Sequence, residues 1–289
     1  MRYAKLAQAI GGYLCTYLLF PCPLKAQDAS LDWQAQLYGG EYYKDTRVGA
    51  YGIASKGVLD DFAFTGEILY ERYRGGDNDG YDDYSFAGAG AHFLWNAKAW
   101  AKFGLVGSHS HDEYRYDAAF VDPKSEYVSN TLGFEGELDL DPVTLALQVG
   151  KISTEYYNND HAYLSMDAYY WGADYLWLAR GAVRRSRNYE EYTIEAYRTF
   201  FPGALPLSLY AGATTNDLTT EEELRTYHTQ YDSYYTGGYL EFLTTTSSAW
   251  SLWVEAARYD KDTILSVELN ITFGPGVVAP YISAFGFTP

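Results

Sequence analysis

Apolar and polar residues alternate with a period of two along most of the chain. In the segment 265–273, leucine, valine, isoleucine and phenylalanine occupy the odd positions, while serine, glutamate, asparagine and threonine occupy the even ones. Neighbouring side chains of a β-strand point to opposite faces, so a period of two is the spacing of a strand with two different faces. The pattern predicts strands and gives no support for helices.

The same alternation recurs from one end of the chain to the other. Clear examples occupy residues 128–138, 143–151, 207–213 and 250–256. The predicted strands that contain these examples are each roughly 9–11 residues long or slightly more, the length that a tilted strand needs to cross hydrocarbon. The predicted strands are 33–43, 47–56, 62–74, 82–95, 99–110, 126–138, 143–154, 162–172, 176–184, 192–201, 207–215, 234–244, 250–259 and 263–273. The count is about 14, within a range of about 12–16 and even, because residues 162–184 form either one bent strand or two.

The connectors between these strands fall into two sets. One set is short and rich in turn-forming residues, near 57–61, 96–98, 139–142, 202–206 and 246–249. The other set is mostly longer and polar, near 75–80, 112–124, 155–161, 185–191 and 216–232. Short turns on one side and long loops on the other are typical of barrels that cross an outer membrane. We therefore expect long loops outside the cell.

The first 26 residues differ from the rest of the chain. Arg2 and Lys5 precede an apolar run over residues 6–20, and the small residue Ala26 follows. This layout is typical of a secretory signal peptide, with cleavage after Ala26. Both cysteines lie within this segment, so the remainder has no disulfide or thiol site.

Charge and composition narrow the function further. The chain carries a net charge of −17, which disfavours binding to nucleic acid phosphates and favours cations. After residue 26 no apolar run is long enough for a transmembrane helix. Yet aromatic residues make up 18% of the chain, and tyrosine and tryptophan accumulate where lipid meets water.

The chain resembles the porin-like outer-membrane β-barrels of Gram-negative-type bacteria. The features that carry the resemblance are the leader, the alternation and the apolar face that ends at Phe273. The resemblance is to the class and covers the whole chain after the leader, residues 27–289, with the predicted barrel over 27–273. It implies an all-β fold, a transmembrane antiparallel up-and-down β-barrel that is exported to the outer membrane and surrounded by its lipid. Such a sheet must close, since backbone polar groups in lipid have to be paired within the protein.

The segment 274–289 departs from the class, because such barrels usually end on an aromatic residue like Phe273. Residues 274–289 remain apolar, with Val277, Ile282 and Phe285 among them. A solvated tail of this composition is disfavoured. We expect an extra strand, a segment folded into the lumen, or a contact with an envelope protein partner.

If the apolar face meets lipid, the opposite face lines the barrel. The predicted pore-lining residues are Glu67, Glu135, Glu195, Glu241, Glu255, Glu268, Lys102 and Arg184. Acidic residues outnumber basic ones, and charged rings select ions of opposite sign, so we expect a cation-favouring pore for small solutes. The alternative is a lumen packed with side chains, since small barrels are filled and large ones hold water.

Four aromatic residues fall on the same inner face: Tyr38, Tyr210, Tyr239 and Trp253. Aromatic faces stack on sugar rings, which would suit passage or export of a saccharide. The alternatives are that these rings fill volume or belong to the interfacial girdles.

Two loop segments carry weaker signals. Asp77, Asp79 and Asp82 offer oxygen ligands for Ca²⁺, but no glutamate closes the loop as in the twelve-residue calcium motif, so a solvated acidic loop is favoured and no cofactor is expected. His109 and His111 lie at an outer strand end, on the face opposite to Ser108 and Ser110. A serine and its neighbouring histidine therefore cannot pair as nucleophile and base.

Three functions remain open at this point. The first is a pore or conduit for small cationic or saccharide solutes. The second is a structural, assembly or polysaccharide-export component with a blocked lumen. The third is a hydrolase at the outer rim; we expect the chain not to be an enzyme.

Overall fold

The computed structural model describes thirteen stretches of the chain. They are residues 32–42, 45–59, 61–75, 81–116, 124–155, 159–172, 175–186, 189–200, 206–222, 225–245, 248–259, 262–274 and 282–285. The predicted leader (1–26) lies outside the described residues, as do Asp77, Asp79 and the side chain of Asp82.

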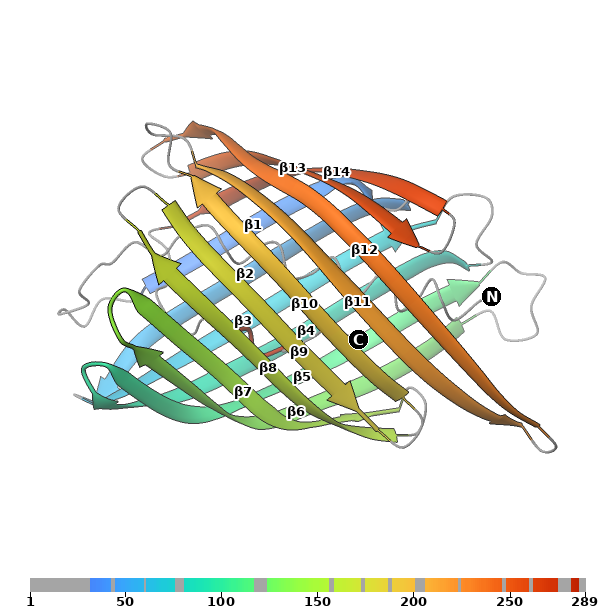
Figure 1. Cartoon of the computed structure of the whole chain (residues 1–289), viewed down its shortest axis with the longest axis horizontal. Coiled ribbons are helices and arrows are strands. Elements are labelled where there is room, and N and C mark those ends of the chain that lie inside the picture. Colours follow the sequence, from blue (N-terminus) through green and yellow to red (C-terminus); the bar gives the residue numbers. More distant parts are fainter. Residues whose placement is uncertain are drawn as a thin grey trace.

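The described residues form one closed antiparallel barrel of 14 strands, in which each strand pairs with its neighbours in the sequence (Figure 1). The strands are β1 (Asp32–Tyr42), β2 (Asp45–Leu59), β3 (Phe62–Arg74), β4 (Tyr81–Lys98), β5 (Ala101–Tyr116), β6 (Lys124–Asp139), β7 (Val143–Thr154), β8 (Asn159–Trp171), β9 (Tyr175–Arg185), β10 (Tyr189–Phe200), β11 (Leu207–Glu222), β12 (Arg225–Thr244), β13 (Ser248–Tyr259) and β14 (Asp262–Phe273). This confirms the predicted fold class and strand number. Residues 162–184 belong to two strands, β8 and β9. Among the described residues, no helix has the length and apolar character to span a membrane.

The barrel closes where β1 pairs with β14. Seven pairs join these strands, from Ala35 opposite Phe273 to Glu41 opposite Val267. Closure leaves the described sheet without an edge strand, so its backbone donors and acceptors are paired around the full circle. The segment 282–285 is not one of the barrel strands.

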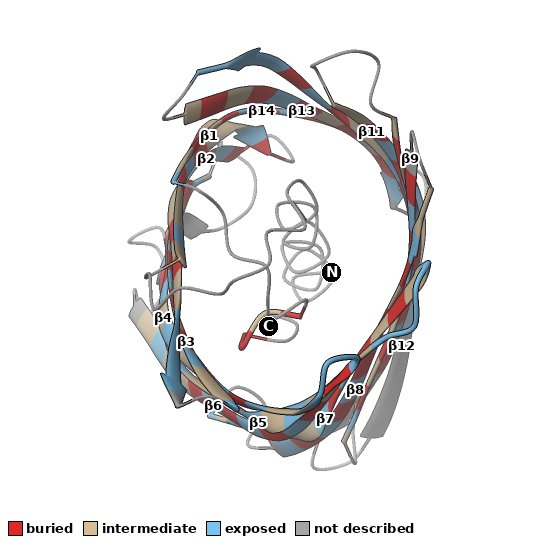
Figure 2. Cartoon of the chain, turned by 90° about the vertical axis from the view of Figure 1, so that its left-hand side faces the viewer, coloured by how far each residue is buried: buried red, intermediate tan, exposed pale blue. Residues whose placement is uncertain are grey.

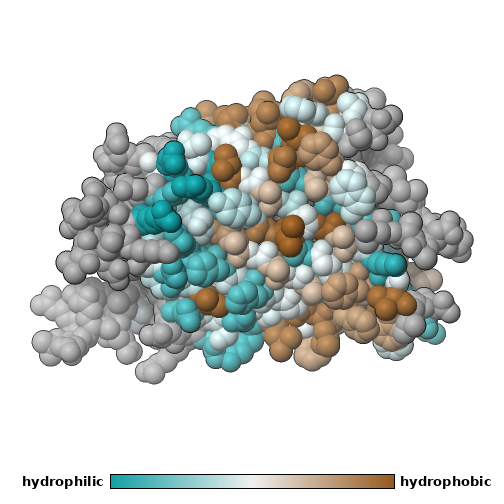
Figure 3. Space-filling view, turned by 180° about the vertical axis from the view of Figure 1, so that it is seen from behind, coloured by the Kyte–Doolittle hydropathy of each residue, from teal (hydrophilic) through white to brown (hydrophobic). Residues whose placement is uncertain are grey.

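The two faces of the wall differ as the alternation predicted. In β10, Glu191, Thr193 and Glu195 are buried, whereas the intervening Tyr192 and Ile194 are exposed, Ile194 by 67%. The most exposed apolar side chains of other strands continue this outer face: Ile68, Leu132, Phe134 and Leu265. Figure 3 shows apolar side chains over much of the outer wall and polar ones toward one end. A continuous exposed apolar band is suited to contact with lipid.

The prediction of long outer loops was wrong for several connectors. The segment 216–232 is mostly sheet, because β11 runs to Glu222 and β12 begins at Arg225. Likewise β5 continues to Tyr116, and β9 and β10 are joined across residues 186–188. Polar composition is typical of loops, but a strand that has left the hydrocarbon can also be polar, because it keeps pairing with its neighbour while both of its faces meet water. The extra length therefore extends the strands at that end.

Candidate functional site: the inner wall and the segment bound to it

The predicted pore-lining residues all face the inside of the barrel. Seven are buried: Glu67, Glu135, Arg184, Glu195, Glu241, Glu255 and Glu268. The eighth, Lys102, is partly exposed, and its Nζ donates to Oε2 of Glu137 at 2.8 Å. Further buried carboxylates lie on the same face, and among the described residues the buried arginines are only Arg47, Arg180 and Arg184. The inner wall is thus strongly acidic.

Arg47 on β2 is the centre of a charged cluster at the seam of the barrel. Its Nη1 lies 3.0 Å from Oε1 of Glu268 on β14, and its Nη2 donates to Glu71 on β3. The guanidinium also lies over the rings of Tyr38 and Tyr42, 4.7 and 4.8 Å from their centroids. One cation thus joins side chains from four neighbouring strands across the β1–β14 closure.

A second charged cluster lies on the inner face of β8, β9 and β10. Arg180 Nε and Nη2 donate to the two oxygens of Asp167 at 2.8 and 2.7 Å, a bidentate pair. Glu195 lies 3.8 Å from Arg180 Nη1 and accepts hydrogen bonds from Tyr197 and Tyr235. Arg180 balances the charge of these carboxylates, and the two tyrosine hydroxyls donate hydrogen bonds to Glu195. These interactions explain how carboxylates are tolerated on this buried face.

The four predicted lumen aromatics are buried on the inner face, and three of them hydrogen-bond to wall side chains. Tyr38 donates to Glu71, Tyr210 donates to Glu255 at 2.7 Å, and Tyr239 accepts from Ser251. Their place inside the wall separates them from the lipid-interface girdles, which occupy the outer face.

Aromatic rings also contact one another in a row around the inner face. The row runs through Trp253, Tyr42, Tyr73, Tyr84, Tyr114 and Tyr127, with ring centroids 4.6 to 5.9 Å apart. Each ring in the row is therefore covered in part by its neighbours, and the Arg47 guanidinium also lies over Tyr42 and Tyr73. This arrangement favours a structural lining over a free stacking platform for sugars.

A third polar cluster centres on His92 of β4. Its Nδ1 lies 2.8 Å from Oε2 of Glu135 on β6, and its Nε2 lies 3.2 Å from Oε1 of Glu67 on β3. Gln148 on β7 donates to Glu135 at 3.4 Å. The His92 cluster (Glu67, His92, Glu135 and Gln148) thus joins side chains of β3, β4, β6 and β7 in one polar patch.

The segment 282–285 binds directly to this patch. Gln148 Nε2 donates to the carbonyl oxygens of Ile282 and Ser283 at 3.0 and 3.3 Å. Oε2 of Glu67 accepts from Ser283 Oγ at 2.6 Å and from the Ala284 amide at 3.0 Å. In Figure 2 the coloured segment beside the C label lies inside the ring of strands. Side chains of the wall thus hold the backbone of a non-strand segment within the lumen.

Two glycines make room for the apolar side of that segment. A Cβ on Gly90 would lie 2.4 Å from Cβ of Ala284, and one on Gly88 would lie 2.6 Å from the ring of Phe285. Phe285 is buried and meets Phe86 edge to face, with ring centroids 6.0 Å apart. Only glycine at these inward positions of β4 permits such a close approach. The wall is therefore shaped to receive residues 284 and 285.

Several members of these clusters escaped the sequence analysis. Arg47, His92 and Gln148 belong to no motif, and Gly88 and Gly90 read as ordinary small residues of a strand. One signal was available: Gly88, Gly90 and His92 share the inner face of β4, where other strands carry large polar side chains. A run of missing side chains on an inward face indicates that another part of the protein approaches there.

Comparison with known proteins gives the fold and no closer relationship. No family model matches the sequence, and no curated protein matches it. Among solved structures, the chain is similar to CdiB from Escherichia coli (8% identity, TM-score 0.53, covering 84% of this chain and 63% of that one) and to CdiB from Acinetobacter baumannii (8%, 0.51, 84% and 60%). A further match, with 13% identity and a TM-score of 0.46, is OmpTdeltaL8, a loop deletion mutant of an outer membrane protein of Vibrio cholerae, covering 85% of this chain and 99% of that one.

The chain has the outer-membrane β-barrel fold. It spans about three fifths of the length of each CdiB chain that it matches. With identities near a tenth, this likeness concerns the fold alone.

Proposed function

We propose that the protein is an outer-membrane channel that favours small cations and cationic solutes, with a lumen narrowed by its own segment 282–285. The observation that carries the proposal is the inner wall: a closed 14-strand barrel whose inward face is polar and acidic. A barrel of this size lies between filled small barrels and the water-filled pores of 16–18 strands. Its apolar outer face supports a place in lipid, at the outer membrane.

The excess of carboxylates supports cation preference. Arg47 and Arg180 each lie among two acidic groups, and Glu67 and Glu135 flank a single histidine. Paired arginines cancel only part of the wall's negative charge. Rings of carboxylates lower the energy of a cation in a pore and raise that of an anion.

The bound segment suggests a second candidate, a barrel that is permanently blocked and serves as a structural or assembly component. The observation in its favour is the fit of residues 282–285 to a patch shaped for them. The two candidates differ in conductance. A channel passes current in a planar bilayer, whereas a blocked barrel stays silent.

Replacing Glu241 and Glu255 together by glutamine should reduce cation preference. Both side chains are buried on the inner face, and they accept hydrogen bonds from Thr244 and Tyr210, which the glutamine carbonyl can still accept. The substitution removes charge and keeps shape, so the barrel should fold. In a salt gradient across a planar bilayer, we expect the reversal potential to move toward zero.

The matched control is Glu41→Gln on the exposed outer face of β1. That variant removes one carboxylate charge away from the lumen, and its reversal potential should equal that of the unaltered protein. A double inner-face variant that retained the full reversal potential would contradict the assignment of these carboxylates to the conduction path.

A further inference from the structure

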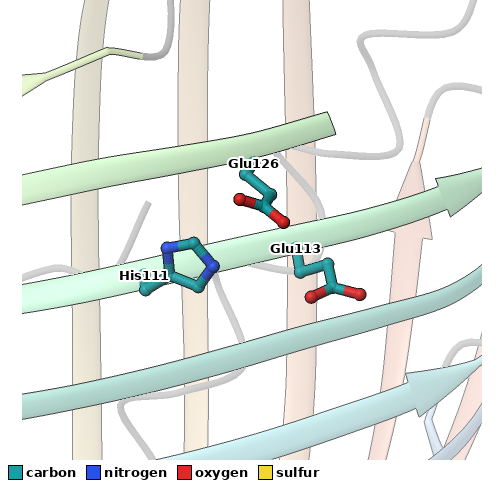
Figure 4. Close-up of side chains that lie close together, drawn as sticks. All are labelled: His111, Glu113 and Glu126. Carbon is teal, nitrogen blue, oxygen red and sulfur yellow. The ribbon is translucent and has the colours of Figure 1, made fainter. Parts of the chain in front are cut away.

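A separate cluster of metal-binding side chains lies on the outer face of the barrel. His111 and Glu113 of β5 and Glu126 of β6 each place one possible ligand atom within 4.8 Å of the other two. Figure 4 shows the three side chains gathered beside the ends of the two strands. None of them takes part in the inner-wall clusters.

The sheet register explains why they meet. His111 and Glu113 are two residues apart on β5 and therefore share a face, and Glu113 is directly opposite Glu126 on β6. Two carboxylates in directly opposed positions of an antiparallel pair repel each other. A cation bound between them would remove that repulsion. Arg115 Nε donates to Oε1 of Glu113 at 2.7 Å and fixes the orientation of that carboxylate.

The cluster lies beyond the apolar band. Leu105 of β5 and Leu132 of β6 belong to the exposed apolar face, with exposures of 49% and 69%. Further along the same strands the outer face carries His109, which bonds Asn130 at 2.9 Å, and then the cluster. Glu126 is exposed and its two partners are half-buried. The position is therefore open to ions from the surrounding water.

We propose that His111, Glu113 and Glu126 bind one divalent transition metal ion of the Zn²⁺ type. One imidazole nitrogen and two carboxylates are a ligand set that Zn²⁺ accepts, whereas Ca²⁺ takes oxygen ligands only. Three protein ligands leave a coordination position for water or for an anionic group at the membrane surface. Small rotations of these accessible side chains close the distances to those of one bound ion. The site is independent of conduction through the lumen.

The test uses the full chain without a histidine tag, folded in detergent, stripped of metal and titrated calorimetrically with ZnCl₂. We expect one Zn²⁺ per chain. His111→Ala and Glu126→Gln should each weaken binding by about tenfold or more, as changes around metal sites do. The control is His109→Ala, which removes the neighbouring outward histidine and should leave the affinity unchanged. Excess CaCl₂ should not displace the Zn²⁺.

Three results would overturn the site. The first is that the unaltered chain does not bind Zn²⁺. The second is that His111→Ala and Glu126→Gln bind Zn²⁺ with the affinity of the unaltered chain. The third is that His109→Ala loses as much affinity as they are expected to lose. A parallel circular-dichroism melt separates these outcomes from misfolding, because Glu126→Gln changes an exposed side chain and should leave the melt in the absence of metal unaltered. Added Zn²⁺ should raise the melting temperature of the unaltered chain and of His109→Ala, and should raise that of His111→Ala and Glu126→Gln by less.

Discussion

Removal of residues 275–289 should raise the single-channel conductance several-fold. The described part of that stretch, residues 282–285, lies inside the barrel and bonds to β3 and β7 through Glu67 and Gln148. It contributes no barrel strand, so the β1–β14 closure remains when it is absent. The lumen then loses the buried side chains of Ile282, Ala284 and Phe285 and gains water. The measurement is conductance in a planar bilayer before and after the truncation.

A single substitution tests the same point without shortening the chain. In Gly90→Leu, the new side chain would occupy the space of Ala284, whose Cβ lies 2.4 Å from the position of a Cβ on residue 90. The segment should leave its patch, and conductance should rise in the same direction as in the truncation. Ala89→Leu is the matched control, because Ala89 is the adjacent residue on β4 and is exposed on the outer face.

The outcomes distinguish the two proposed functions. Higher conductance in both the truncation and Gly90→Leu, with Ala89→Leu unchanged, supports a channel narrowed by its own segment. Current in the unaltered protein that the truncation leaves unchanged would show that the segment lies outside the conduction path. Silence of the unaltered protein and of Ala89→Leu, with current only in the truncation and Gly90→Leu, would support a barrel blocked by its own segment, and silence in all four proteins would contradict a channel.

The faces of the wall could be predicted because alternation is a local property. Phe134 and Glu135 are neighbours in the sequence, and strand geometry alone sends one outward and the other inward once the outer solvent is lipid. The strand number followed from repetition of the same rule. Loop lengths did not follow, because polar composition alone does not distinguish a loop from a strand that extends into water, as β11 and β12 do beyond residue 215.

The clusters on the inner wall could not be predicted, because they depend on closure of the barrel. Arg47 and Glu268 are 221 residues apart, and Glu67 and Ala284 are 217 apart. Nothing local in the sequence pairs them; β14 reaches β1 only when all the strands between them are in register. His92 carried no signal for the same reason, since its partners come from β3 and β6.

Replacement of Arg47 by alanine should cause a large loss of barrel stability. Its guanidinium is almost fully buried and bonds Glu71 and Glu268 from the two sides of the seam. Without it, two buried carboxylates remain without their shared cation, a change that costs about 3–5 kcal/mol in other proteins. We expect the midpoint of denaturant unfolding in detergent micelles to fall accordingly. The control Arg185→Ala breaks an ion pair with Glu190 in which the arginine side chain is 69% exposed, and it should cost less than about 1 kcal/mol.

A second experiment distinguishes two causes of the stability loss in Arg47→Ala, unpaired buried charge and lost side-chain packing. A triple variant, Arg47→Met with Glu71→Gln and Glu268→Gln, keeps similar volumes and removes all three charges. Because the penalty of Arg47→Ala arises from unpaired buried charge, the triple variant should recover most of the lost stability, as uncharged replacements of buried ion clusters do. A triple variant as unstable as Arg47→Ala would instead assign the effect to the contacts of the guanidinium with Tyr38, Tyr42 and Tyr73. Recovery in the triple variant beyond that of Arg47→Met alone would establish that charge balance at the β1–β14 closure stabilises the barrel.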